Sequence, residues 1–231
     1  MRGVPASPLG FLDQALGLTL RDHPILLTFF TICFLLSGIF WIYKPQHRIT
    51  SWVCALSFWL GGSLYIENLV MAETHAHQGT SLGLFVMAMW SLDKSQEFPK
   101  WIYFLLLAVL SSLYFHAGLA KLMVSGPEWI NGPGLQVILH YYQSDSHLAQ
   151  YFLENAKISS VAQTIVLLLE LGALSFLIFP TLRLPYGVLL SLFHFAIFLL
   201  FGWVFLGHSA LIFVNLLLAP LFFTPRLEKK I

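Results

Sequence analysis

PILLTFFTICFLLSGIFWIY, residues 24–43, contains no charged side chain along its whole length. A helix needs about 20 predominantly apolar residues to cross the hydrocarbon core of a bilayer, and this stretch supplies them. Inside the bilayer each backbone N–H must find its hydrogen bond within its own segment, so an unbroken apolar run of this length favours a helix. We therefore expect a membrane-spanning helix over residues 24–43.

The composition of the whole chain indicates the same class of protein. Of its 231 residues, 58% are hydrophobic and 10% are charged, and the mean hydropathy is +0.77. Soluble domains carry about 25% charged residues, and a porin-type barrel would be less apolar because its strands alternate. The net charge of +1, without a basic block, argues against nucleic-acid binding. We therefore predict an all-α integral membrane protein.

Charged residues, Pro and Gly divide the chain into seven apolar segments, which predict a polytopic helical bundle with about seven membrane-spanning helices. The segments are residues 24–43, 50–71, 78–92, 100–123, 159–180, 184–206 and 208–223. The third and seventh are short for a span. For residues 78–92, a spanning helix and a re-entrant segment both remain open.

The N-terminal residues 1–23 form a separate segment ahead of one transmembrane domain, residues 24–231. Residues 9–23 read as an amphipathic helix lying at the membrane interface. The segment lacks the charged start and apolar core of a cleavable signal peptide, so we expect the first span to be retained.

Lysine and arginine residues in the connections predict the orientation in the membrane. The side that holds the N-terminus receives three of them: Arg2, Arg21 and Lys157. The opposite side receives eight: Lys44, Arg48, Lys94, Lys100, Arg183, Arg226, Lys229 and Lys230. We therefore expect an outer N-terminus and a cytoplasmic C-terminus. The long polar loop 124–158 and the loop ETHAHQG (residues 73–79) then both lie outside.

Lys121 ends the stretch YFHAGLAK, residues 114–121, within the fourth span. Two interpretations are open. The side chain either extends to the lipid headgroups or packs inside the bundle, where desolvation would favour a neutral amine able to act as a general base. Gly118 and Ala117 allow a neighbouring helix to approach closely, which favours the interior position.

Glu170 and His194 fall near the mid-depth of the fifth and sixth spans. Ionisable groups at this depth are rare and usually pair inside the bundle. We expect the two side chains to hydrogen-bond to each other, either as a purely structural pair or as the inner wall of a cavity.

The remaining polar candidates gather toward the outer face. His75 and His77 lie two residues apart, so on a helix they would point to different faces. We therefore expect them to form hydrogen bonds to a substrate and not to coordinate a metal ion. Glu67 lies one turn from the outer end of the second span. His116 precedes Lys121 by five residues, about 140° round a helix, and need not share its face.

The turn EWINGPG, residues 128–134, follows Lys121 on the same side. It carries Trp129 and Asn131, which are candidate cavity residues. Trp129 could equally belong to the aromatic belt at the membrane interface.

These residues together resemble the horizontally transferred transmembrane (HTTM) domain shared with vitamin K-dependent γ-carboxylases. The resemblance extends over about residues 20–225. Its most specific block is an aromatic helix ending in Tyr114, Ala117, Gly118, Lys121 and Leu122, followed by Trp129 and Gly132. Glu170 followed by His194 matches a second block, and the loop with His77 a weaker third. Small DoxX-like membrane proteins share AGLAKL but lack the histidine loop, and rank second.

The resemblance implies a chemistry. In the carboxylases, the lysine at the Lys121 position is taken as the base that deprotonates vitamin K hydroquinone. Reaction with O₂ then gives a strongly basic alkoxide, which abstracts a glutamyl γ-proton so that CO₂ can add. The histidine near the His77 position, with His75 one alignment shift away, is thought to stabilise an intermediate.

For this chain the resemblance implies a quinol- or lipid-linked oxygenase or carboxylase-like enzyme, acting at the extracytoplasmic face with Lys121 as base. A reduced quinone, O₂ and CO₂ would be its co-reactants, and a quinone or membrane lipid its ligand. The expected location is the inner membrane of a bacterium. The animal carboxylases continue into a large lumenal part, whereas this sequence stops at Ile231. A non-catalytic membrane partner, for example for an exported peptide, is the alternative function.

Overall fold

A computed structural model describes residues 24–44, 46–66, 72–93, 99–131, 133–141, 146–201 and 206–219. All regular secondary structure in these ranges is helical. The interfacial helix expected over residues 9–23, the side chain of Glu67 and the C-terminal tail lie outside the described residues. The chain divides into two compact units, residues 1–106 and 107–231, and each unit is described by itself.

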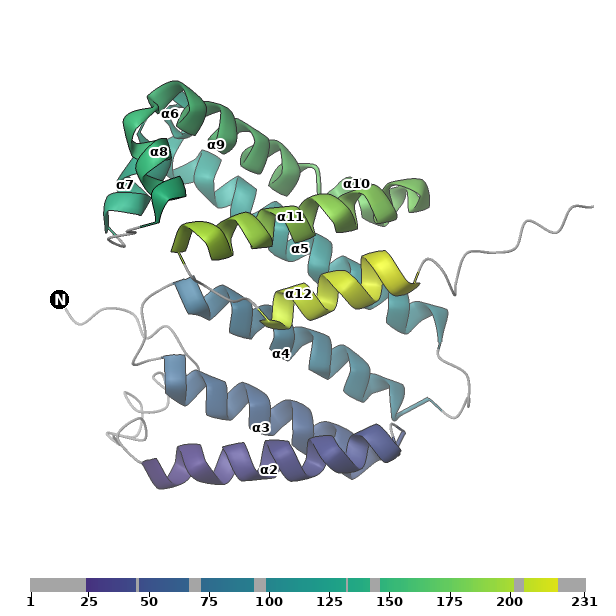
Figure 1. The fold of residues 1–231 in the computed structure, drawn as a ribbon. Coiled ribbons are helices and arrows are strands. Elements are labelled where there is room, and N and C mark those ends of the chain that lie inside the picture. The colour runs from purple at the N-terminus through teal and green to yellow at the C-terminus, as the bar shows by residue number, and fades with distance from the viewer. Residues whose placement is uncertain are drawn as a thin grey trace, which may run out of the picture. The chain divides into compact units, whose positions relative to one another are not determined.

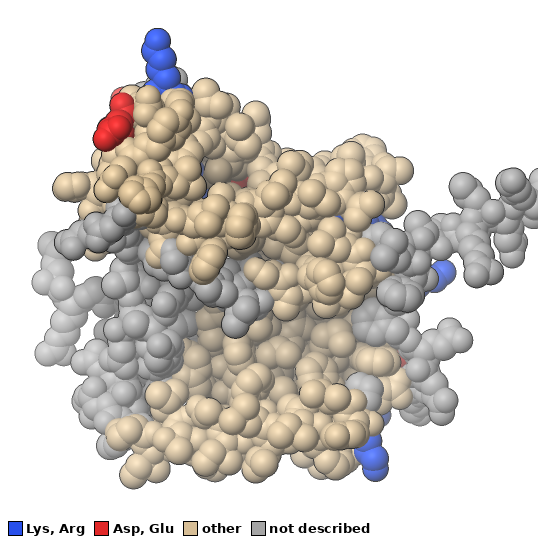
Figure 2. Space-filling view, viewed as in Figure 1, with Lys and Arg blue, Asp and Glu red and all other residues tan. Residues whose placement is uncertain are grey.

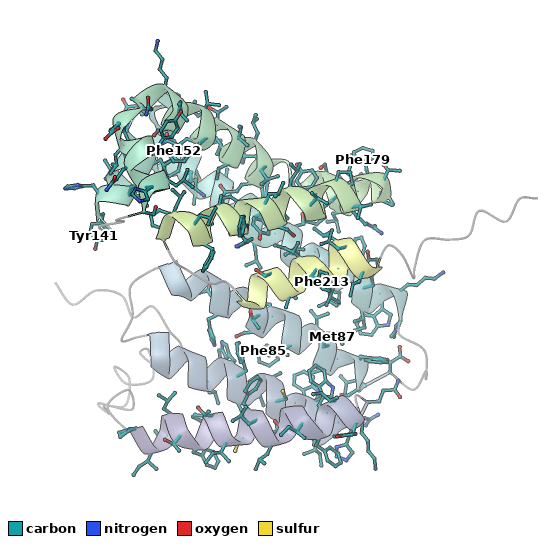
Figure 3. The ribbon with its side chains drawn as sticks, viewed as in Figure 1. Phe85, Met87, Tyr141, Phe152, Phe179 and Phe213 are labelled. Carbon is teal, nitrogen blue, oxygen red and sulfur yellow. The ribbon has the colours of Figure 1, made fainter. Side chains whose placement is uncertain are left out.

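The first unit contains α2 (Pro24–Tyr43), α3 (Arg48–Ile66) and α4 (Ala72–Trp90), which follow one another side by side (Figure 1). Aromatic side chains fill the space between neighbouring helices. Phe85 of α4 lies with its ring centroid 6.1 Å from those of both Trp52 and Trp59 of α3 (Figure 3). At one end of the unit, Arg48 Nε donates a 3.3 Å hydrogen bond to the carbonyl of Ser91.

The helix α5 (Lys100–Ser125) begins in the first unit and continues into the second. The other helices of the second unit follow in chain order: α6 (Glu128–Asn131), α7 (Gly134–Tyr141), α8 (His147–Glu154), α9 (Ala156–Leu171), α10 (Leu174–Ile178), the 3₁₀ helix η2 (Pro180–Leu182), α11 (Arg183–Phe201), α12 (Leu206–Ile212) and the π-helix η3 (Phe213–Leu218). Figure 1 shows α6, α7 and α8 clustered at one end of α9.

Four helices in the described part of the chain are long and apolar enough to cross a membrane: Pro24–Tyr43, Lys100–Ser125, Ala156–Ile178 and Pro180–Phe201. They correspond to four of the seven expected spans. The other three segments, around α3, α4 and α12 with η3, are helical in the described residues. Their membrane crossing, and with it the total of seven, stays a prediction. On the face in Figure 2, few of the described atoms belong to Lys, Arg, Asp or Glu.

Two expected loops are in fact helical. Residues 73–79 were expected to form a loop before a helix at residue 78, but α4 begins at Ala72 and includes them. His77 gains a stacking contact with Phe58 of α3 from this helical position, at 5.1 Å between ring centroids. The loop 124–158 contains the short helices α6, α7 and α8, because each of the latter two can bury an apolar residue, Leu139 and Ala149 respectively.

Candidate functional site

Lys121 and Glu170 form an ion pair between α5 and α9. The Lys121 ammonium donates to both carboxylate oxygens of Glu170, with N–O distances of 2.5 and 2.6 Å. The Glu170 side chain is 4% exposed and that of Lys121 is 24% exposed. The amine is therefore the side of the pair that a ligand can reach, while the carboxylate lies inside the helix packing.

Close packing of α5 against α9 brings the two charges together. A Cβ atom at Gly118 would come within 3.1 Å of Leu171 and closer still to Glu170 Cβ. Only a residue without a side chain allows this approach. Beyond Glu170 the helix breaks at Gly172 and Ala173, and Ser111 of α5 donates a 3.0 Å hydrogen bond to the carbonyl of Ala173.

Trp129 of α6 covers the ion pair. The Lys121 amine lies 5.6 Å from the centroid of the Trp129 ring, a cation–π contact. The indole Nε1 is buried and has no hydrogen-bond partner among the described residues. The aromatic ring of Trp129 and its indole N–H thus lie next to the accessible amine of Lys121.

Hydrogen bonds from α9 hold the cluster of α6, α7 and α8 in place. With its amide oriented to match its surroundings, the buried Gln163 donates to the Trp129 carbonyl and accepts from the N–H groups of Gly134 and Leu135. Ser160 donates a 2.5 Å bond to the carbonyl of Ile130. The helix that carries Glu170 therefore also fixes the position of Trp129.

The expected hydrogen bond between Glu170 and His194 is wrong. Both oxygens of Glu170 are taken by Lys121, and His194 Nε2 lies 2.5 Å from the hydroxyl of Tyr114 on α5. Each side chain has a partner on α5 instead, Lys121 for Glu170 and Tyr114 for His194. Tyr114 belonged to the recognised sequence block, but nothing in the sequence predicted its bond to α11.

His77 lies in the first unit, whereas Lys121 lies in the second. Its Nε2 is 3.1 Å from the carbonyl of Phe58 and 3.4 Å from Ser81 Oγ. The His77 ring occupies the position that a Cβ atom of Gly62 on α3 would take, so this glycine leaves room for the ring. Whether His77 and Lys121 share one site stays a prediction.

Of the other predicted site residues, only His116 has a described side chain, and it lies outside this arrangement. His116 is exposed, with its Nδ1 2.7 Å from the carbonyl of Ser112 one turn earlier on α5. His75 and Asn131 lie on α4 and α6, but their side chains, like that of Glu67, are outside the described residues. Gln163 is the structural residue that the sequence analysis missed, since a glutamine in an apolar helix carries no motif.

A model of the HTTM domain matches residues 63–226. The chain belongs to the HTTM domain family. The matched range begins in α3 and includes Lys121, Glu170, Trp129, Tyr114 and His194. This family fits the predicted HTTM resemblance and not the second-ranked DoxX-like proteins.

The HTTM domain is the transmembrane domain associated with vitamin K-dependent carboxylase. Together with its four apolar helices, this assignment makes the chain a membrane protein. No curated protein and no solved structure matches the sequence.

Proposed function

We propose that this HTTM domain is an enzyme that binds a membrane-soluble quinol or related hydroxylated lipid beside Lys121 and removes a proton from it, in an oxygenase or carboxylase-like reaction. The observation that carries the proposal is the Lys121–Glu170 pair, in two helices apolar enough to span the membrane. Ionisable groups in such helices are costly and are typically functional.

The residues around Lys121 suit a hydroxylated ring. Trp129 offers an aromatic surface next to the amine, and its buried indole N–H has no hydrogen-bond partner among the described residues. Gly118 lets α9 approach α5 closely enough for Glu170 to hold the Lys121 amine beside this ring. A bound quinol would supply the electrons for reaction with O₂.

The proton acceptor in this proposal is the pair, not an isolated lysine. Two interacting titratable groups take up and release protons as a unit. The pair is neutral overall, whether the shared proton is on Lys121 or on Glu170. Accepting one proton leaves one positive charge on the pair, placed to stabilise the ligand oxygen that has lost its proton.

The proposal also includes the topology and the partner residues in the first unit. We place Lys121, Trp129 and His77 toward the outer face of a bacterial inner membrane, with seven spans, an outer N-terminus and a cytoplasmic C-terminus. The support is the excess of lysine and arginine on the opposite side. His77, with His75 and Glu67 near it in sequence, stays a proposed site residue of the first unit.

Replacing Lys121 with arginine tests the function. Arginine keeps the charge but does not give up its proton, so Lys121→Arg should insert normally and lose activity. The protein is reconstituted in nanodiscs with reduced menadione as the probe quinol and CO₂ present. Oxygen consumption and oxidised products are measured. We expect a loss on the order of 100-fold, the lower range for a general base.

Lys157 provides the matched control, because it is an exposed lysine on α9 away from the pair. Lys157→Arg should keep the wild-type rate. Turnover by Lys121→Arg at the wild-type rate would contradict the proposal. The proposal would also be contradicted if the wild type were inactive and bound quinone or lipid no more tightly than Lys121→Ala. Either result would favour a non-catalytic membrane partner.

A further inference from the structure

Tyr114 and His194 place two further titratable side chains beside the ion pair. The hydroxyl of Tyr114 lies 2.5 Å from His194 Nε2, and Tyr114 itself is 5% exposed. The two rings meet edge to face, with an interplanar angle of 74°. Contact with lipid does not require a tyrosine and a histidine that lie this close to each other between apolar helices.

The Lys121–Glu170 pair and the Tyr114–His194 pair both involve side chains from one face of α5. Seven residues separate Tyr114 from Lys121, which is close to two full turns, so both side chains leave the same side of the helix. Gly118 lies between them on that side, and Glu170 of α9 packs against it. Glu170 therefore meets α5 between the levels of Tyr114 and Lys121.

We propose that Tyr114 and His194 act with Lys121 and Glu170 as one proton-transfer unit, in which Tyr114 passes a proton from Glu170 to His194. This inference rests on the proposed function of Lys121 and adds a route by which the base is restored. The ion pair would accept the proton, and His194 would hold it until release.

The transfer balances without any further reactant. When the shared proton of the pair lies on Glu170, the neutral Lys121 amine takes the proton of the ligand hydroxyl and becomes an ammonium. The proton on Glu170 then moves to the Tyr114 oxygen, directly or through one water, as the proton of Tyr114 moves to His194 Nε2. Glu170 is again a carboxylate, Tyr114 is again a neutral phenol and His194 has become an imidazolium.

Tyr114→Phe and His194→Gln test the route. Phenylalanine keeps the ring and removes only the hydroxyl. The glutamine amide can still accept the tyrosine hydrogen bond, but it does not titrate in this range. In the nanodisc assay with reduced menadione, both variants should lose on the order of tenfold or more in kcat with KM nearly unchanged. The solvent deuterium isotope effect on kcat should rise in both.

Matched controls are available on α8. Tyr151 is an exposed tyrosine and His147 an exposed histidine, so Tyr151→Phe and His147→Gln remove the same groups elsewhere. Both should keep the wild-type rate and isotope effect. Thermal unfolding of His194→Gln should resemble that of the wild type, which separates proton transfer from a structural tether.

A wild-type rate and isotope effect in Tyr114→Phe would overturn the relay. So would a wild-type rate in His194→Gln, because a tether alone would tolerate glutamine. If Lys121→Arg is inactive in the same experiment, the proposed function stands and only the relay fails. If Lys121→Arg is fully active, the proposed function fails and the relay fails with it.

A double-mutant cycle in detergent tests the link without any turnover. If Tyr114 and Glu170 are joined, the loss in Tm of the Tyr114→Phe/Glu170→Gln protein should be smaller than the two single losses added. Strict additivity would also overturn the relay.

Discussion

Lys121 was open to two interpretations from the sequence, a snorkelling side chain or an interior one, and its contacts decide between them. Its ammonium bonds to Glu170 and lies over the ring of Trp129. A pair of opposite charges is tolerable in an apolar interior, whereas either charge alone is not. The two residues are therefore linked in stability as well as in chemistry.

We expect Lys121→Met to destabilise the protein by about 3 kcal/mol, because it leaves the buried Glu170 carboxylate without its partner. Adding Glu170→Gln to Lys121→Met should recover a large part of that loss. Chemical denaturation of the purified protein in detergent measures both. The pair would not be coupled if the double variant lost as much as the two single variants together.

The residue types at the site could be predicted from the sequence, but their partners could not. Lys121, Glu170 and His194 were recognised because ionisable groups in apolar segments are rare. Which two meet depends on the rotation of each helix about its own axis, and a helix that is apolar on all sides carries no periodic signal for that rotation. Glu170 was therefore assigned to the wrong partner.

At the level of the helices, the sequence was most informative where a segment was long and uniformly apolar. Residues 24–43 are helical within the predicted limits. The sequence was least informative between the expected spans, where α6, α7 and α8 are only 4, 8 and 8 residues long. Helices this short are stable only through packing, here against α9. The sequence contains no pattern that predicts this contact.

The contact between α5 and α9 depends on Gly118. Gly118→Ala should destabilise the protein by about 1–3 kcal/mol, because the added methyl group would overlap Glu170 and Leu171. It should also lower the nanodisc activity by moving Glu170 away from Lys121. Denaturation and turnover of the same preparation would show both effects.

Ala120 is exposed on the same helix, so Ala120→Leu is the control and should change neither quantity. A Gly118→Ala protein as stable and as active as the wild type would mean that α9 can shift without disturbing the site.

For the molecule as a whole, the orientation in the membrane can be tested at two exposed lysines. Lys157 lies on the side predicted to be outside and Lys44 on the side predicted to be cytoplasmic. The two native cysteines, Cys33 and Cys54, are free and are first replaced by alanine. In whole cells, Lys157→Cys should react with a membrane-impermeant thiol reagent, and Lys44→Cys should react only after permeabilisation. Labelling of both sites in intact cells would refute this orientation.

The distance between Lys121 and Glu170 along the chain matters during synthesis. Glu170 follows Lys121 by 49 residues, so at roughly 5–20 residues per second a ribosome delivers it several seconds later. Throughout that interval α5 is already in the translocon with an unneutralised lysine. Its flexible stem lets the charge wait at the headgroup level, and the arrival of α9 then draws it inward. Membrane insertion of this protein should accordingly be a timed, two-step event, in which the ribosome's pace sets how long the lysine waits.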